Sequence, residues 1–294
     1  LGFKYALADG YDVRQMSNVF QTLERVSNMS GGGKLPQWLE THPDPENRIT
    51  ATQARLAKLP PNALNGTKVN RDSYLQHVQG LVYGDNPRQG YFKGSTFYQP
   101  DLKFMLVFPQ GWKTQNGTDA VVAVSPNQDA VVQLSLAPNM TPAQASQAFF
   151  AQQGLQSSQV GQTTVNGSSA VQGYFDAQTD QGAVRGLAVF LAYGNTTYQL
   201  MGYSPTAAFQ GHEAEVRQTV GSFRALTDQA ALNVQPARIE LVKLPRAMTI
   251  QQFNQQYPST ISMSELGLIN EVDSTGTLPA GQMVKRVVGG TGQP

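Results

Sequence analysis

The sequence predicts a multidomain α+β protein, and three patterns along its 294 residues indicate this class. Apolar side chains recur at three- and four-residue steps over residues 1–58, as in amphipathic helices. From about Tyr91 the pattern becomes alternating and β-branched, which is typical of strands. After residue 236 a short span predicts a strand, two helices and a strand. The chain is also longer than one typical domain.

The first predicted region, residues 1–60, is helical. Its first helical run ends at Gly31-Gly32-Gly33, and a second helix over residues 46–59 opens near Pro45. Pro60-Pro61 ends that helix. Residues 61–90 are expected to form a helical linker with one short helix over 72–82.

The second predicted region, residues 91–228, is an antiparallel α+β domain. Two helices are expected at 142–153, with Thr141 as N-cap, and at 207–222. Asn166-Gly167 and Gly194-Asn195 lie between strand candidates, as hairpin turns do. The six predicted strands cover residues 102–108, 120–125, 130–136, 169–177, 183–192 and 196–203.

The third predicted region, residues 236–294, follows a linker over 229–235 and forms a small βααβ module. Its elements are expected at residues 238–243, 249–257, 263–268 and 283–288.

Composition excludes several classes of function. The 21 basic and 20 acidic side chains give a net charge of +1, so nucleic acid is not an expected partner. No apolar run is long enough for a transmembrane segment. The chain has no cysteine, which excludes disulfides, thiolate catalysis and cysteine zinc sites.

The residues alone reveal no catalytic motif. No two histidines have the i, i+4 spacing of HExxH, in which two imidazoles on one helix face share a zinc ion. The nearest string is His212-Glu213-Ala214-Glu215-Val216, which is expected to be a solvated helix face because valine cannot bind metal. By its residues alone the chain is a multidomain protein of undefined activity.

Two strings in the helical region resemble the HtpX-like zinc metallopeptidases, family forty-eight of the gluzincins. Leu1-Gly2, Tyr5-Ala6, Ala8 and Gly10-Tyr11-Asp12 match the continuation of that family's zinc-ligand helix, with Val13 in place of the usual proline. The string Trp38-Leu39-Glu40-Thr41-His42-Pro43-Asp44-Pro45-Glu46-Asn47-Arg48-Ile49 is similar to its conserved W-L-S-T-H-P segment. The resemblance implies that residues 1–60 are the helical end of a zincin domain.

The same resemblance implies auxiliary catalytic roles for His42 and Arg48. His42 would contact the zinc or the oxyanion, and Arg48 would organise nearby carboxylates. In the alternative reading His42 caps a turn and Arg48 pairs on a helix surface. The zinc-ligand glutamate would precede Leu1, so zinc is expected in the full-length protein and not in this chain, which is expected to be inactive alone.

The other two regions carry further resemblances. Phe108-Pro109-Gln110-Gly111-Trp112 and Val220-Gly221-Ser222-Phe223-Arg224 resemble PsbP-like domains, which bind or scaffold. Residues 236–294 resemble LysM-like modules through the steps Leu266 to Asn270 and Leu278 to Gly281. LysM modules bind peptidoglycan-type glycans, but this copy lacks their Gly-Asp-Thr start, so a packing role stays open.

Together these resemblances imply the C-terminal portion of a periplasmic zinc endopeptidase of envelope quality control in a Gram-negative bacterium. Polypeptide substrates, envelope proteins and peptidoglycan are the expected partners. The alternative is a non-catalytic envelope binding or scaffolding protein. Phe97, Tyr98 and Trp112 are candidates for a recognition surface, although aromatic residues beside strands are expected at the edge of a core.

Overall fold

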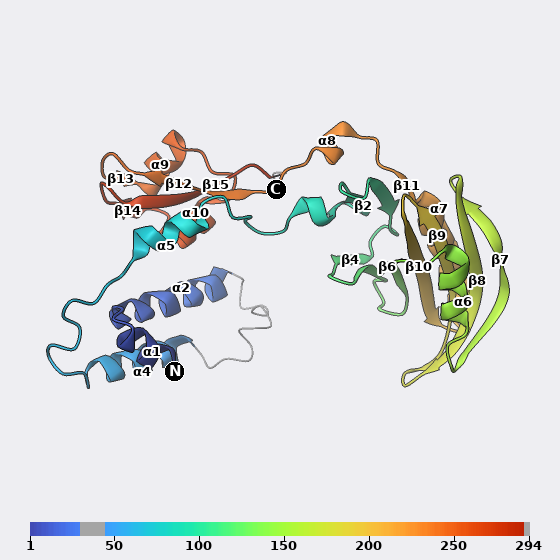
Figure 1. Ribbon diagram of the computed structural model, residues 1–294, viewed down its shortest axis with the longest axis horizontal. Helices are drawn as coiled ribbons and strands as arrows, with labels where there is room; N and C mark the ends of the chain where they lie inside the picture. Colours follow the sequence, from blue (N-terminus) through green and yellow to red (C-terminus); the bar gives the residue numbers. More distant parts are fainter. Residues whose placement is uncertain (30–44, 291–294) are drawn as a thin grey trace. The chain divides into compact units, whose positions relative to one another are not determined.

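The computed structural model describes residues 1–29 and 45–290 and divides the chain into two compact units (Figure 1). Unit 1 combines residues 1–84 with residues from 237 onward, and unit 2 is the continuous segment 85–236. The division places the segment before residue 85 with the C-terminal module.

Unit 2 is built on a seven-stranded antiparallel sheet of order β4-β5-β6-β10-β9-β8-β7. The strands are β4 (Lys113–Asn116), β5 (Ala120–Val124), β6 (Val131–Ala137), β7 (Leu155–Val165), β8 (Ser168–Thr179), β9 (Gly182–Tyr193) and β10 (Thr196–Pro205). Asn166 and Gly167 both have positive φ, 47° and 84°, as a type I′ hairpin turn between β7 and β8 requires. This hairpin turn, expected from the sequence, is therefore observed.

A smaller four-stranded sheet packs into the same unit in the order β1-β2-β3-β11. Its strands are β1 (Tyr91–Lys93), β2 (Thr96–Gln99), β3 (Phe104–Val107) and β11 (Arg224–Ala225). β11 pairs with β3 directly after the second helix of the unit, so the end of unit 2 closes onto its beginning.

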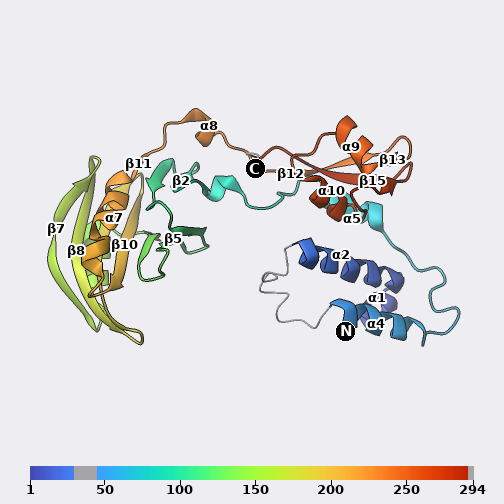
Figure 2. The same cartoon turned by 180° about the vertical axis from the view of Figure 1, so that it is seen from behind.

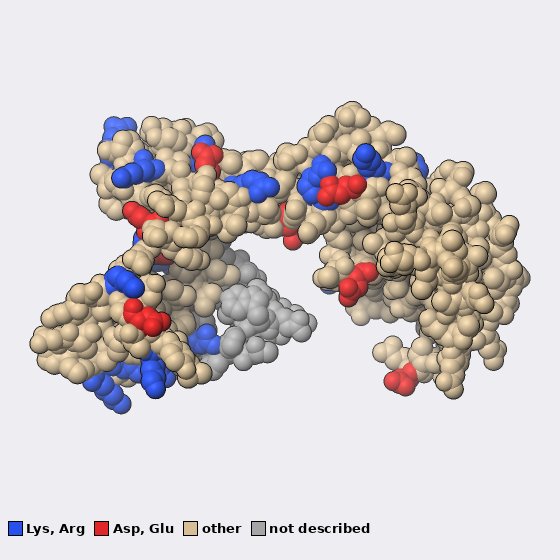
Figure 3. Space-filling view, in the orientation of Figure 1, with Lys and Arg blue, Asp and Glu red and all other residues tan. Residues whose placement is uncertain are grey.

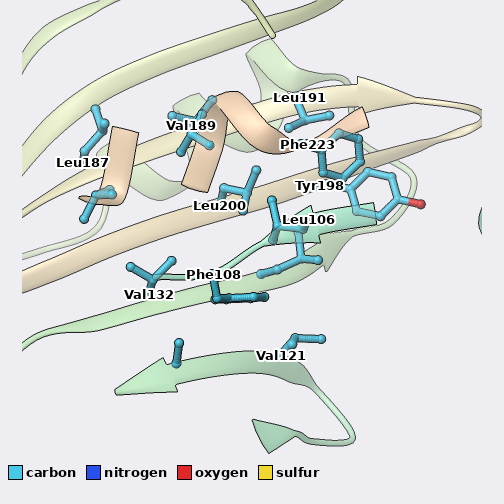
Figure 4. Close-up of a cluster of buried hydrophobic side chains, with 14 of the residues drawn as sticks. Leu106, Phe108, Val121, Val132, Leu187, Val189, Leu191, Tyr198, Leu200 and Phe223 are labelled. Atoms are coloured by element: carbon cyan, nitrogen blue, oxygen red, sulfur yellow. The ribbon is translucent and has the colours of Figure 1, made fainter. Parts of the chain in front are cut away.

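Two helices cover opposite faces of the large sheet, α6 (Pro142–Phe150) and α7 (Phe209–Ser222) (Figures 1 and 2). The alternation along β9 explains this sandwich, because successive side chains of a strand point to opposite faces. Leu187, Val189 and Leu191 join the core under α7, while Ala188 and Phe190 pack on the α6 side (Figure 4). Both faces of β9 are therefore buried.

The predicted antiparallel α/β architecture is confirmed for unit 2, where all six expected strands and both helices occur. Thr141 caps α6 through a capping box with Gln144, as its sequence position predicts. The sequence missed β1, β2, β4, β7 and β11. β7 was missed because it is an exposed edge strand whose sequence, LQSSQVGQTTV, has no apolar alternation.

The N-terminal part of unit 1 is helical over its described residues. Its elements are α1 (Gly2–Ala8), η1 (Val13–Gln15), α2 (Met16–Met29) and α4 (Pro45–Leu56). Phe3 in α1 and Val13 in η1 are buried apolar residues of this part. Residues 30–44, which include the triple glycine and His42, lie outside the described residues.

The C-terminal part of unit 1 contains the predicted strand, two helices and strand, together with two short strands, β13 and β14, that the sequence did not predict. It comprises β12 (Arg238–Lys243), β13 (Met248–Thr249), α9 (Ile250–Gln256), α10 (Met263–Ile269), β14 (Thr277–Leu278) and β15 (Met283–Val288). β12 and β15 pair antiparallel, and Ile250, Phe253 and Leu266 form its core with neighbouring apolar residues.

Residues 61–90 do not form the separate helical linker expected from the sequence. Helix α5 (Arg71–Val78) is followed by an extended segment that bonds to β12. Ile239 donates its backbone N–H to Leu81 (2.9 Å), and Gly80 and Tyr83 donate theirs to Ile239 (2.7 Å) and Ala237 (2.8 Å). Periodicity could not reveal this pairing, because it depends on a partner more than 150 residues away.

The first and last residues of unit 2 are hydrogen-bonded to other parts of that unit. η2 (Pro87–Gln89) places Arg88 so that its guanidinium donates to the Leu232 carbonyl oxygen (2.6 Å) and pairs with Asp101. Leu232 ends helix α8 (Gln229–Leu232), inside the stretch 229–235 that the sequence predicts as a linker. Residues 85–90 and 229–235 are therefore parts of unit 2 rather than spacers.

Candidate functional site

The two residues expected to assist catalysis cannot both be located. His42 lies outside the described residues. Arg48 lies in the first turn of α4, and its guanidinium carbon is 5.7 Å from the centre of the Phe20 ring on α2. Arg48 forms no ion pair with a described residue, so its N–H donors are not committed to a carboxylate within this part of the chain.

The Gly10-Tyr11-Asp12 string forms a tight corner before η1. The Asp12 carboxylate accepts the backbone N–H of Arg14 (3.0 Å) and also pairs with its guanidinium (2.7 and 2.8 Å). These bonds from Arg14 lower the pKa of Asp12 against the opposing effect of burial. Asp12 therefore serves as a helix cap here, which is sufficient to explain an aspartate at this position.

Lys68 closes the same corner from the other side. Its backbone N–H donates to the Gly10 carbonyl (2.9 Å), and its own carbonyl accepts the Asp12 N–H (3.0 Å). Its ammonium lies 4.6 Å from the centre of the Tyr11 ring, within the range of a cation–π contact. The family-like string is thus anchored through backbone bonds rather than exposed as a loop.

The described residues do not fit a zinc site. Over residues 1–29 and 45–290 no group of three histidine, aspartate or glutamate side chains is arranged to hold a metal ion. Structural and catalytic zinc sites need at least three protein ligands.

His212, expected on a solvated helix face, is instead packed and paired. Its ring contacts Trp112 edge to face at 5.7 Å, and its side chain is only 20% exposed. Nδ1 lies 3.1 Å from the Glu215 carboxylate, and Nε2 lies 3.4 Å from that of Asp129. Burial alone would lower the pKa of His212, but the two carboxylates outweigh it and raise that pKa.

The Asp129 carboxylate ties this cluster to the turn between β5 and β6. It accepts the Ser125 hydroxyl at 2.7 Å, and this bond, with help from His212, lowers the pKa of Asp129. The serine bonds to the aspartate and not to the histidine, so these residues do not form a nucleophilic triad. The cluster instead links the β5–β6 turn to α7.

A second polar cluster lies where α7 crosses β8. The Tyr174 hydroxyl donates to Glu213 and accepts from Arg217, and Arg217 also donates to Glu213 at 2.8 Å. The Tyr174 ring lies 5.2 Å from the guanidinium carbon of Arg185, which pairs with Asp176 at 2.8 Å. Both arginines have carboxylate partners, so the cluster presents no uncompensated cation to a ligand.

The aromatic candidates are mainly core residues, as expected. Phe97 and Trp112 are buried in the main cluster of unit 2. Tyr98 is half-buried and its ring stacks on Tyr91 at 5.3 Å. The sequence therefore identified these side chains correctly as packing residues at the edge of the core.

The face of the molecule seen in Figure 3 carries no patch of a single charge sign. Figure 3 shows basic and acidic side chains scattered over the visible face rather than gathered into a patch of one sign. Helix α6 and strand β7 contain no charged residue. Among the described helices, none is long and apolar enough to cross a bilayer.

Sequence reasoning missed both polar clusters of unit 2. The spacing of His212 and Glu215 at i, i+3 was a usable signal, since such residues are neighbours on a helix. No comparable signal in the sequence pointed to Asp129 or Tyr174, because strand pairing and helix packing bring them to α7 from distant parts of the chain.

Comparisons with known proteins add structural matches only. No protein-family model and no curated protein matches this chain. Similar solved structures include the cyanobacterial PsbP (CyanoP) from Synechocystis sp. PCC 6803, with 11% identity over 50% of this chain and 98% of that one and a TM-score of 0.37.

Two further structures match at a similar level. LpqN of Mycobacterium tuberculosis, described as involved in cell envelope biogenesis, has 16% identity over 53% of this chain and 96% of that one, with a TM-score of 0.33. A Pseudomonas aeruginosa protein of unknown function has 17% identity over 40% of this chain and 88% of that one, with a TM-score of 0.30. Likenesses this low carry no argument about function.

Proposed function

We propose that this chain is the C-terminal part of a periplasmic zinc endopeptidase that removes damaged envelope proteins in a Gram-negative bacterium. The observation that carries the proposal is the string from Trp38 to Ile49, which resembles the W-L-S-T-H-P segment of the HtpX-like metallopeptidases, with Glu40 in place of its serine. The zinc and its ligands belong to residues outside the described chain. On this proposal the chain alone has no peptidase activity.

Arg48 is the described residue through which this chain would act on the reaction. Its guanidinium packs over Phe20, which restrains the side chain while its N–H groups stay available. A guanidinium can hold a carboxylate through two parallel hydrogen bonds. Arg48 would therefore position carboxylates beside the peptidase cleft, and His42 would assist at the developing oxyanion.

The proposal is tested on a chain extended upstream by the length of a zincin domain. Elemental analysis should find about one zinc per extended chain and none in the present chain, and only the extended chain should cleave an unstructured peptide. Arg48→Ala should lower kcat about tenfold or more with unchanged zinc content. Arg55→Ala, on the same helix, is the matched control and should retain full activity. Zinc-free, inactive extended protein would refute the proposal.

His42 is tested in the same extended protein. His42→Ala should reduce turnover and leave the midpoint of thermal unfolding nearly unchanged, because the proposed role of His42 is in the reaction and not in stability. Kinetics identical to those of the parent protein would remove His42 from the mechanism.

A second candidate is a non-catalytic binding or scaffolding protein of the cell envelope. It is favoured by the C-terminal module of unit 1, which carries the LysM-like steps Leu266 to Asn270 and Leu278 to Gly281. Sedimentation with purified peptidoglycan tests it, with residues 85–236 as the matched control. Retention of the whole chain, but not of the control, would support glycan binding by unit 1.

A further inference from the structure

Strand β7 forms an unprotected edge of the large sheet. Among the described strands it pairs with β8 alone, and it lies at the outside of the sheet in both ribbon views (Figures 1 and 2). Of its residues only Val165 is buried, and the strand contains no charged residue and no proline. Natural proteins usually protect such an edge, because its free N–H and C=O groups can pair with a further strand.

The other edges of the two sheets in unit 2 carry the usual protective features. β4, at the opposite end of the large sheet, has four residues and begins with Lys113. In the small sheet, β1 has three residues and ends with Lys93, and β11 has two residues and begins with Arg224. Short strands and charged side chains both discourage pairing. β7, with eleven residues, is therefore the described edge of unit 2 best suited to accept another strand.

A bulge limits the usable part of β7 to its C-terminal half. The register of the β7–β8 pairing shifts at residues 158–161, and from there the pairing is regular over residues 161–165. Val165 flanks the two-residue turn to β8 and exchanges backbone bonds with its partner there. Because bonded and non-bonded pairs alternate, Gln162 and Thr164 point their N–H and C=O groups outward.

A hollow of about 230 Å³ adjoins this part of β7 on the face of the sheet that α7 covers. A molecule of liquid water takes about 30 Å³, so the hollow has room for a side chain. Its walls come from the end of β7, from β8 and β9, and from the last turns of α7. The lining residues that reach solvent are Thr163, Thr164, Asn166, Gln172, Arg217 and Gly221.

The accessible lining is polar and its charge is balanced. Neither the Thr163 hydroxyl nor the Gln172 amide is bonded to a described residue, so both remain available to a ligand. The Arg217 guanidinium also lines the hollow, but it already pairs with Glu213 at 2.8 Å. A cation would be repelled by Arg217, and an anion would compete with Glu213. A long uncharged side chain with an amide, which both donates and accepts, fits this lining.

We propose that an extended segment of another polypeptide adds to β7 as a further antiparallel strand and places a glutamine-like side chain in the hollow. Its backbone would bond to Gln162 and Thr164. Thr163 shares the α7 face with Val165, whose side chain joins the core under that helix, so the incoming side chain opposite Thr163 would lie on that face too. Backbone bonds would supply affinity, and the hollow would select the side chain.

A second copy of this chain fits the hollow less well than a different polypeptide. Two β7 strands paired antiparallel about Thr163 would place the second Thr163 opposite the first, and Gly161 opposite Val165. Neither threonine nor glycine is long enough to fill the hollow. A different polypeptide is free to present a longer side chain at these positions.

The test titrates the whole chain with acetylated, threonine-rich heptapeptides that differ only in a central guest residue. Binding should protect the amides of Gln162 and Thr164 from hydrogen exchange, because both become bonded. A glutamine guest should bind about three- to tenfold more tightly than glycine, the contribution of one neutral hydrogen bond. A lysine guest should bind no better than glycine. Absence of binding at about 1 mM peptide, or binding without protection of these two amides, would overturn the proposal.

Gly221→Leu isolates the hollow, and Gly211→Leu, on the same helix, is its matched control. A Cβ added at either glycine meets nothing within 4 Å, so both positions accept a side chain without a clash. From Gly221 the leucine would occupy the hollow that this residue lines. It should remove the advantage of the glutamine guest and leave the glycine guest unchanged, whereas Gly211→Leu should alter neither. Equal effects of the two variants would overturn the proposal.

Gln162→Pro tests the edge itself, and Gln162→Ala is its control because it keeps the backbone N–H. Proline is tolerated on an edge strand where its N–H would face solvent. The proline variant should abolish binding of every peptide, and the alanine variant should retain it. Equal binding by the two variants would contradict strand addition. Sedimentation equilibrium without peptide should find a monomer, and a dimer that Gln162→Pro dissociates would replace the proposed partner by a second copy.

Discussion

The two units differ in how the chain assembles them. Unit 2 is one continuous segment whose last strand, β11, pairs with β3 near its beginning, and all of its core residues come from 85–236. Unit 1 draws on both ends of the chain, and its C-terminal module is completed by backbone bonds to residues 80–83. Continuity allows a unit to fold by itself, whereas unit 1 must close a loop of about 150 residues.

The largest effect is expected from cutting the chain at these boundaries. Residues 85–236 alone should unfold cooperatively at nearly the midpoint of the parent chain. Residues 237–290 alone should be largely unfolded, because the edge of β12 loses its bonds to residues 80–83. Circular dichroism on heating measures both. A stable fragment 237–290 would contradict the dependence of this module on the earlier segment.

A joined fragment supplies the control. Residues 68–84 linked by a short flexible linker to 237–290 should regain cooperative unfolding, because α5 and the extended segment restore the missing bonds.

Truncation of one core phenylalanine in each unit should act locally. Phe104 contacts the rings of Phe97, Tyr198 and Phe223, and Phe253 is fully buried in the C-terminal module. Each change to alanine should reduce the free energy of unfolding of its own unit by about 3–5 kcal/mol. Hydrogen exchange resolves the two units. Equal loss of protection in both units would show that they fold as one.

Asn270 is the polar centre of the C-terminal module. Its amide donates to the carbonyls of Leu266 (2.9 Å) and Lys285 (2.8 Å), and its oxygen accepts the Lys285 N–H (2.8 Å). Asn270→Ala should destabilise unit 1 by about 2–3 kcal/mol, because these buried backbone groups lose their partner. Asn254→Ala is the control on the neighbouring helix. If both substitutions lowered the free energy of unfolding in urea equally, the hydrogen bonds of Asn270 would not be the cause of the loss.

The smallest effect is expected from His212, and it depends on pH. Its pKa is raised in the folded state, so its contribution is complete below the unfolded value of about 6.5 and disappears as pH rises through the folded value. His212→Gln should therefore destabilise unit 2 more at pH 5.5 than at pH 8.5, by no more than about 1 kcal/mol. Urea unfolding at both pH values measures this difference.

His77→Gln provides the control for the pH dependence. His77 lies on α5 in unit 1 and has no carboxylate partner among the described residues. Its substitution should not change how the stability of unit 2 varies with pH. A His212→Gln effect that is the same at both pH values would mean that the histidine acts through packing on Trp112 alone.

The sequence predicted elements well where one pattern decides them and poorly where distant residues decide. The capping box at Thr141 and the hairpin turn at Asn166-Gly167 are local, and both are observed. Strand β7 was not predicted, because an exposed edge strand needs no apolar face and so shows no apolar alternation. The backbone hydrogen bonds of residues 80–83 were not predicted, because their partners, residues 237–239, lie far along the chain.

The candidate site residues also divide into those that a local pattern predicts and those whose surroundings depend on distant residues. Arg48 was placed on a helix by its spacing after Pro45, and it lies there. His212 contacts Asp129 in the β5–β6 turn and Trp112 just before β4. Helical spacing cannot reveal contacts with such distant segments.

The short pairing of residues 80–83 with residues 237–239 also has a mechanical consequence. When the chain is pulled at points before residue 80 and after residue 239, the force crosses these backbone bonds directly. Unit 2 lies in the loop of chain that they close and bears no tension until they rupture. The pairing thus acts as a mechanical clamp that keeps the strand-rich unit folded while the rest of the protein is stretched.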